Sequence, residues 1–130
     1  MSDLLFDTCF LIDLEREMRR GAGPAHAFLV DNATSHPWVS WTVVGEFAEG
    51  FGDIRDRACA AMLSRFDVVA MDEATAGHYA RITGTLRRKR QIIGTNDLWI
   101  AAAALASGFS LVTNNAAHFS RVAGLKVVGY

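Results

Sequence analysis

The sequence predicts an α/β domain with a mostly parallel central sheet of four to five strands and helices on both faces. Short apolar runs alternate with longer helical segments along the 130 residues, which is the pattern of strands joined by crossover helices. No internal repeat, low-complexity segment or linker interrupts the alternation. The length also suits one domain, so we expect a single unit over residues 1–130.

Five short apolar runs are expected to form the strands, because each is bounded by turn-forming or helix-capping residues. These runs cover residues 4–6, 38–41, 67–71, 109–113 and 125–130. In such a sheet the strands lie between helices, which explains why the runs are so apolar.

The expected helices fill the intervals between the strands. They cover residues 9–18, 25–32, 43–51, 53–66, 72–91 and 97–107, with a turn or short helix at 114–119. Thr8 is expected to cap the first helix and Pro24 to open the second, while Gly108 stops the helix before the fourth strand. The small side chains of Ala101–Ala104 would let that helix lie close to the sheet.

Two of these helices carry further expectations. In 53–66 the apolar face is expected to contain Ile54, Ala58, Ala61 and Met62. The segment 72–91 is either one long helix or a helix pair, since glycines weaken it twice.

Composition restricts the class of protein. Hydrophobic residues make up 51% and charged residues 21% of the chain, as in a folded globular protein. No apolar run approaches the ~20 residues of a membrane span, and the N-terminus lacks the features of a secretory signal. Cys9 and Cys59 are expected to be free buried thiols in a cytoplasmic protein, because disulfides are rare in that compartment.

The net charge of −1 does not indicate a nucleic-acid-binding protein, but one basic cluster stands out. Arg81 precedes four consecutive basic residues, Arg87, Arg88, Lys89 and Arg90. Such a cluster either contacts phosphate groups or is the solvated end of a helix, where positive charge suits the dipole.

Three acidic residues occupy positions expected at one edge of the sheet. Asp7 directly follows the first strand, Glu46 lies early in the helix after the second, and Asp97 lies in the first turn of its helix. Ligands of open α/β sheets bind at the carboxyl ends of the strands. Three converging carboxylates would repel one another, and a hard divalent cation would remove that conflict. Each residue taken alone also has a structural explanation, such as helix capping.

In their order along the chain, four motifs resemble those of PIN domains, and most of all the VapC-type toxins of toxin–antitoxin pairs. They are FDTCFLID, Glu46 within WTVVGEFAEG, NDLWIAAAA and LVTNNAAHF. The resemblance covers essentially the whole chain. It implies an α/β/α endoribonuclease that depends on Mg²⁺ or Mn²⁺, with Asp7, Glu46 and Asp97 as metal-site residues, an antitoxin partner, and a homodimer or larger assembly.

The fourth motif departs from the family pattern. Many relatives have an aspartate where this chain has Asn115, and asparagine offers an oxygen without charge. Thr113 and Asn115 are therefore expected either to hold a water or orient a carboxylate, or to cap the short helix that follows.

The resulting hypothesis is hydrolysis of an RNA phosphodiester. Asp7 and Asp97 would be the principal metal ligands, and Glu46 would be a further ligand or would position and deprotonate the attacking water. The sequence does not choose between one ion and two. The basic residues 87–90 would contact the RNA backbone.

Several aromatic and polar residues have simpler expected roles. The tryptophans Trp38, Trp41 and Trp99 are expected to pack in the core or an interface and not to stack on bases. Apolar residues at an interface could include Phe28, Trp41 or Phe51. His118 is expected at a helix end or on the surface, and Asp13 as a surface acid.

Two other functions stay open from the sequence. One is a PIN-like module that binds RNA or protein without cutting, which Asn115 keeps plausible. The other is a receiver-like domain that accepts phosphate at an aspartate after the third strand. That reading fits poorly, because Met71 stands at the end of the strand, Asp72 comes one position later and the only late lysine is Lys126.

Overall fold

The computed structural model describes residues 2–130, and five strands in that range form one parallel sheet. They are β1 (Asp3–Phe6), β2 (His36–Val39), β3 (Asp67–Val68), β4 (Ser110–Val112) and β5 (Val127–Val128). The strand order is β3-β2-β1-β4-β5, and every neighbouring pair is parallel. The predicted fold class is therefore confirmed. A receiver domain has the order 2-1-3-4-5, so the strand order argues against the receiver-like alternative.

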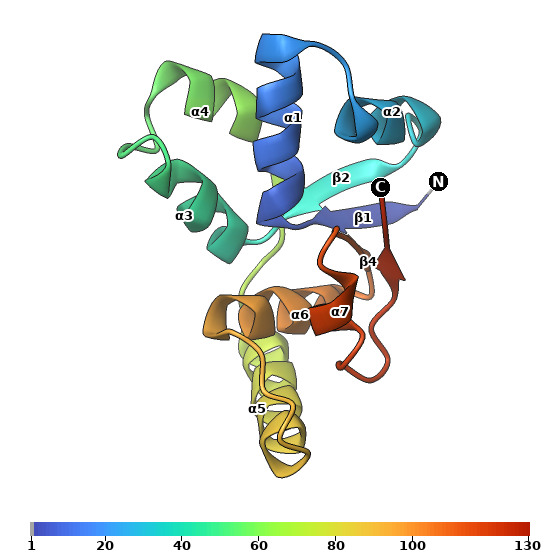
Figure 1. Cartoon of the computed structure of the whole chain (residues 1–130). Helices are drawn as coiled ribbons and strands as arrows, with labels where there is room; N and C mark the ends of the chain where they lie inside the picture. The colour runs from blue at the N-terminus through green and yellow to red at the C-terminus, as the bar shows by residue number, and fades with distance from the viewer. Residues whose placement is uncertain (1) are drawn as a thin grey trace.

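Helices cover both faces of this sheet, which gives three layers (Figure 1). One side carries α1 (Thr8–Arg20), α2 (Pro24–Asp31), α3 (Trp41–Glu49) and α4 (Arg57–Leu63). The other side carries α5 (Glu73–Arg88), α6 (Thr95–Ser107) and α7 (Ala116–Phe119), with α5 extending away from the sheet.

The central strand β1 is buried from both sides. Leu5 lies opposite Trp38 of β2 and Leu111 of β4, and its side chain is fully buried. On the α1 side, Phe6 packs against Phe10 with ring centroids 4.4 Å apart. On the other side, the alanines Ala101–Ala104 of α6 are buried, so this helix lies close to the sheet as predicted.

The predicted helix starts needed correction at two places. Asp7, and not Thr8, is the N-cap of α1, and its side chain accepts a hydrogen bond from the Thr8 N–H. The second strand covers Pro37 but ends at Val39, because the Ser40 side chain accepts from the Val43 N–H and starts α3 at Trp41. The prediction over 38–41 was wrong since it followed hydropathy past a strong N-cap residue.

The fourth and fifth helices also differ from their predictions. Asp56 caps α4 by accepting from two backbone N–H groups, so residues 53–56 stay outside the helix. Its buried residues are Cys59 and Met62, whereas Ile54, Ala58 and Ala61 are exposed. The segment predicted at 72–91 is one helix, α5, which ends at Arg88.

The remaining general expectations concern cysteines and membrane spans. Cys9 and Cys59 are free thiols, and Cys59 is buried whereas Cys9 is partly exposed. Among residues 2–130, no helix is both long enough and apolar enough to span a bilayer.

Candidate active site

Asp7 lies where β1 ends and α1 begins, and three polar groups contact its buried carboxylate. Its Oδ1 accepts a 2.7 Å hydrogen bond from the Thr8 N–H, and its Oδ2 accepts one of 2.7 Å from the Thr113 hydroxyl. The Cys9 thiol lies 3.6 Å from the same Oδ2. The side chain is only 6% exposed, so these donors offset the cost of burying its charge.

The strand order explains why Thr113 reaches Asp7. Phe6 of β1 pairs with Val112 of β4, and the Asp7 N–H donates to the Val112 carbonyl at 3.0 Å. The residues that follow these two strands therefore lie next to each other. The Thr113 hydroxyl also accepts from the Asn115 N–H at 2.9 Å, which holds the turn after β4 against the acid.

Glu46 of α3 connects the starts of two other helices. Its Oε1 accepts a 2.6 Å hydrogen bond from the Thr8 hydroxyl at the start of α1. Its Oε2 accepts one of 3.1 Å from the side-chain amide of Asn96 in α6. Thr8 was expected only to cap the first helix, and Asn96 was given no role at this site, although each is adjacent in sequence to one of the predicted acids.

Asp97 lies in the first turn of α6, and its carboxylate contacts His118 of α7, which belongs to the fourth motif. The His118 Nδ1 lies 3.5 Å from Asp97 Oδ2 and 2.9 Å from the Asn115 side-chain amide nitrogen. Burial and then the negative charge of Asp7 raise the pKa of Asp97, with a smaller contribution from Glu46, while His118 opposes the shift. The three carboxylates therefore lie near enough to influence one another electrostatically.

An open depression of about 390 Å³ gives access to this part of the molecule. It is lined by Glu46, by Asp97 and by residues 94–96 at the start of α6. Glu46 and Asp97 thus face a concave surface at the carboxyl edge of the sheet, where ligands of α/β proteins bind, whereas Asp7 does not line this depression.

The donor set fits a hard divalent cation in its chemistry. Asp7, Glu46 and Asp97 form no ion pair with Lys or Arg among residues 2–130, and the basic side chain that contacts one of them is His118, beside Asp97. Their oxygens are the ligand type that Mg²⁺ and Mn²⁺ prefer. Hydrogen bonds hold the carboxylates apart, however, and no three His, Cys, Asp or Glu side chains of the described residues are grouped closely enough to hold one ion.

The other predicted residues lie at varied places. Asn115 occupies the N-cap position of α7 without a side-chain capping bond, and its amide meets His118 instead. His118 is at a helix end, as expected, but also contacts Asp97. Asp13 is half-buried and accepts a 2.6 Å hydrogen bond from the Tyr130 hydroxyl, so the expected surface acid was only partly correct.

The predicted basic cluster and the tryptophans do not line the depression beside Glu46 and Asp97. Arg87–Arg90 lies exposed at the end of α5 and in the following turn. Trp99 stacks on Tyr79 with centroids 3.9 Å apart, and Trp38 packs on Phe109; both confirm internal packing. Trp41 is 54% exposed, so it does not belong to the core of this chain.

The sheet is all-parallel, with the order β3-β2-β1-β4-β5, and acidic residues lie at its carboxyl edge. These features place the chain among the open-sheet α/β proteins that carry a polar site at that edge. The chain belongs to the PIN domain family, whose model matches residues 4–125. The family expected from the sequence motifs is thereby confirmed.

Individual relatives agree with this assignment. Ribonuclease VapC1 of Rickettsia felis is 30% identical over 133 residues, covering 96% of this chain and 94% of the relative. Ribonuclease VapC1 of Haemophilus influenzae strain R2866 is 36% identical over 70 residues, covering 54% of this chain, and the match spans about half (52%) of that relative's length.

A solved structure extends the likeness to the fold. VapBC2 from Rickettsia felis, determined with a DNA fragment from its promoter, matches with a TM-score of 0.82 at 23% identity, covering 98% of each chain. At this identity the match supports the shared fold alone.

Proposed function

We propose that this protein is a metal-dependent endoribonuclease that acts as the toxin of a toxin–antitoxin pair. The observation that carries the proposal is the placement of Asp7, Glu46 and Asp97 near one edge of the sheet, close enough that burial and the charges of Asp7 and Glu46 raise the pKa of Asp97. Among residues 2–130, no Lys or Arg forms an ion pair with these three acids. The names of the VapC1 relatives as ribonucleases support the same reaction class.

In this proposal, Asp7 and Asp97 are the principal ligands of Mg²⁺ or Mn²⁺. A divalent ion bound there would stabilise negative charge on the phosphate and lower the pKa of water. The Asp7 carboxylate is already fixed by Thr8 and Thr113, so little reorganisation is needed for it to act as a ligand.

Glu46 is suited to handling the attacking water. It lines the open depression, and its two oxygens are oriented by Thr8 and Asn96. We assign it one of two roles: it positions the water and accepts its proton at a carboxylate oxygen, or it binds the metal as a further ligand.

The test uses the full chain purified without any antitoxin. Asp7→Asn and Asp97→Asn should each lower the rate of RNA cleavage by roughly 100-fold or more, and both should weaken Mn²⁺ binding measured by calorimetry. The matched control Asp31→Asn removes an exposed carboxylate at the end of α2 and should cleave like the unaltered protein. Full cleavage by either site variant would refute the assignment.

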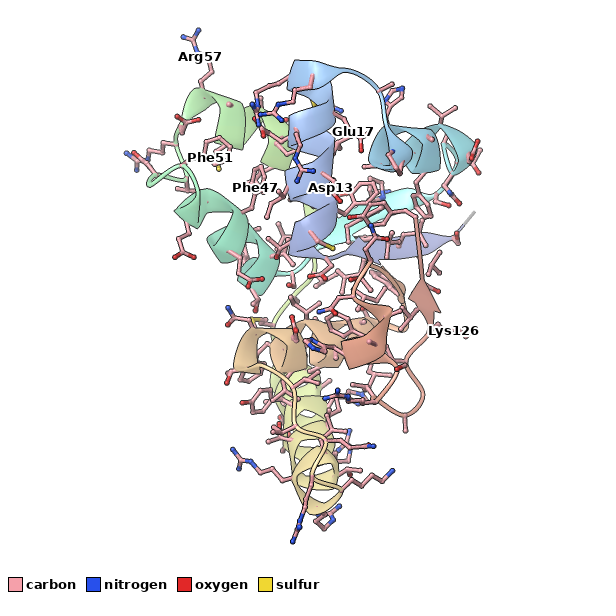
Figure 2. The ribbon with its side chains drawn as sticks, in the orientation of Figure 1. Asp13, Glu17, Phe47, Phe51, Arg57 and Lys126 are labelled. Atoms are coloured by element: carbon pink, nitrogen blue, oxygen red, sulfur yellow. The ribbon has the colours of Figure 1, made fainter. Side chains whose placement is uncertain are left out.

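We also propose an antitoxin as protein partner, with a homodimer or larger assembly. Trp41 supports this part, because it is exposed beside an apolar groove of about 270 Å³ between α3 and α4. Exposed apolar surface of this kind is typical of interaction sites. Phe28 and Phe51 are less available, since they are half-buried and pack on Phe6 and Phe47 respectively; Figure 2 shows Phe47 and Phe51 together on the α3 side.

A further inference from the structure

The charge of the chain divides sharply between its two halves. Residues 1–73 carry six Lys and Arg and thirteen Asp and Glu, a net charge of −7, whereas residues 74–130 carry seven Lys and Arg and one Asp, a net charge of +6. The single acid of the second half is Asp97. Since α5, α6 and α7 lie together on one side of the sheet (Figure 1), the near-neutral total hides a positively charged lobe. Such asymmetry points to a polyanionic ligand.

On α5 the polar side chains form a stripe along one face. His78, Arg81, Thr85 and Arg88 are spaced by three, four and three residues, so they lie on the same side of the helix. The Arg81 guanidinium lies 3.4 Å from His78 Nδ1, and the Arg88 guanidinium donates to the Thr85 hydroxyl at 3.3 Å.

Two glycines lie beside the guanidinium groups of these arginines. A Cβ atom at Gly77 would meet Arg81 Nη1 at 3.5 Å, and one at Gly84 would meet Arg88 Nη1 at 3.4 Å. Both guanidinium groups therefore rest against bare backbone, with their remaining N–H groups free to bind an anion.

Beside this stripe lies a cavity of about 180 Å³ between α5, α6 and the segment that follows α7. Its polar wall is formed by His78, Arg81, Thr85 and Arg121, and its apolar wall by Ile82, Leu86, Leu105 and Val122. Within residues 2–130, neither Arg81 nor Arg121 forms an ion pair with a carboxylate. Two arginines without acidic partners at one cavity are suited to a phosphate group, which they can bind with paired hydrogen bonds.

This cavity is connected to the acidic site through α7. The Arg121 N–H donates to the His118 carbonyl at 3.2 Å, and the His118 ring meets Asp97. The cavity and the carboxylates are therefore linked through residues 118–121, at the end of α7 and just beyond it.

We propose that this cavity binds a backbone phosphate of the RNA substrate, at a position along the strand other than the phosphate that is cleaved at the carboxylate edge. The inference rests on the ribonuclease function proposed above and assigns Arg81 and Arg121 to substrate binding. It differs from the exposed cluster Arg87–Arg90, which does not line this cavity. The phosphate would accept hydrogen bonds from Arg81 and Arg121, which both line the cavity, as a carboxylate does in an ion pair.

The test measures binding of a fluorescein-labelled single-stranded RNA of about 20 nucleotides by fluorescence anisotropy. All proteins carry Asp7→Asn so that the RNA stays intact. The affinity for a single strand falls with salt, and each phosphate contact contributes about 0.7 to the slope of log affinity against log salt concentration. A variant that lacks one contact should therefore show a slope smaller by about 0.7. Its affinity relative to the parent should be about fivefold lower at 0.1 M salt than at 1 M salt. Arg81→Gln and Arg121→Gln should each show both effects.

The control is Arg57→Gln, which removes one positive charge from α4. Figure 2 shows Arg57 at the end of the molecule opposite to α5, so this change should leave the affinity and the salt slope nearly unaltered. Thermal unfolding of each variant checks the fold, and the exposure of both arginines favours retention of the fold.

The possible outcomes separate the two proposals. Loss of affinity and slope in both cavity variants, but not in Arg57→Gln, supports the phosphate site. Cleavage by the unaltered protein together with unchanged RNA binding by Arg81→Gln and Arg121→Gln overturns the site and leaves the ribonuclease function standing. Absence of cleavage by the unaltered protein under any divalent ion overturns the proposed function itself. Weaker binding of a purified antitoxin with unchanged RNA binding also overturns the site.

Discussion

The Thr8 hydroxyl donates a hydrogen bond of 2.6 Å to Glu46 Oε1, while the Thr8 N–H donates one of 2.7 Å to Asp7 Oδ1. One residue thus fixes two of the three carboxylates relative to each other. It does so because Asp7 is the N-cap of α1, which places Thr8 at the first helical position facing α3.

Replacing Thr8 tests this link directly. Thr8→Val keeps the size of the side chain but leaves Glu46 Oε1 without its donor, so RNA cleavage should fall about tenfold or more through loss of orientation. Thr8→Ser keeps the hydroxyl and should stay close to the unaltered rate. Equal rates for the valine and serine variants in a steady-state cleavage assay would show that the hydrogen bond has no role in activity.

A second expectation concerns the stability of the buried acid. Thr113 is fully buried and donates to Asp7 Oδ2 at 2.7 Å. Thr113→Val should lower the free energy of unfolding by about 1–3 kcal/mol, because the carboxylate would lose a donor where water cannot replace it. Urea denaturation measures the change, with Thr113→Ser as the control that retains the hydroxyl. A valine variant as stable as the serine variant would contradict the expectation.

The proximity of Asp7 and Thr113 is the part of the site that sequence reasoning could reach. Both residues follow strands, and the carboxyl ends of parallel strands share one edge of a sheet. The position of Glu46 was harder to anticipate, since it depends on how α3 is rotated about its axis. That rotation is fixed by the burial of Val43, Val44 and Phe47, which hydropathy predicts only as a face and not as a contact with Thr8.

Other features depend on contacts between distant segments and left no local signal. The Tyr130 hydroxyl donates to Asp13, and its ring packs on Phe10 at 4.8 Å. Burial is the main reason why the pKa of Tyr130 is raised, and the Asp13 hydrogen bond adds to it. Trp41 differs in the other direction. Its apolar neighbours in the sequence favoured packing in the core or an interface, and in this chain its side chain is exposed beside α4.

The raised pKa of Asp97 predicts how stability depends on pH in the absence of divalent ions. In the folded protein this carboxyl keeps its proton to a higher pH than its ordinary value of 3.8, so between the two pKa values the folded state binds more protons than the unfolded state. The free energy of unfolding therefore decreases as the pH rises through that window and stays lower above it.

Asp97→Asn removes this cost and should raise the free energy of unfolding at pH 7 without metal. Urea denaturation across the acid and neutral range should show a weaker decrease with pH for this variant than for the unaltered protein. Asp31→Asn is the matched control. Saturating Mn²⁺ should then stabilise the unaltered protein more than Asp97→Asn, and a destabilised Asp97→Asn at neutral pH without metal would contradict the assigned repulsion.

The last prediction adds charge to the site at Asn115, whose side chain lies against His118. Asn115→Asp would place a fourth carboxylate beside Asp97, so the metal-free protein should lose stability through repulsion between like charges. The same charge should strengthen Mn²⁺ binding by several-fold, because affinity for hard cations increases with the number of charged ligands. Isothermal titration calorimetry measures the change, with Asn114→Asp as control, since that side chain is exposed in the same turn. Equal gains in both variants would mean that only the general electrostatic field had changed, whereas a gain confined to position 115 would mean that its side chain faces the bound ion.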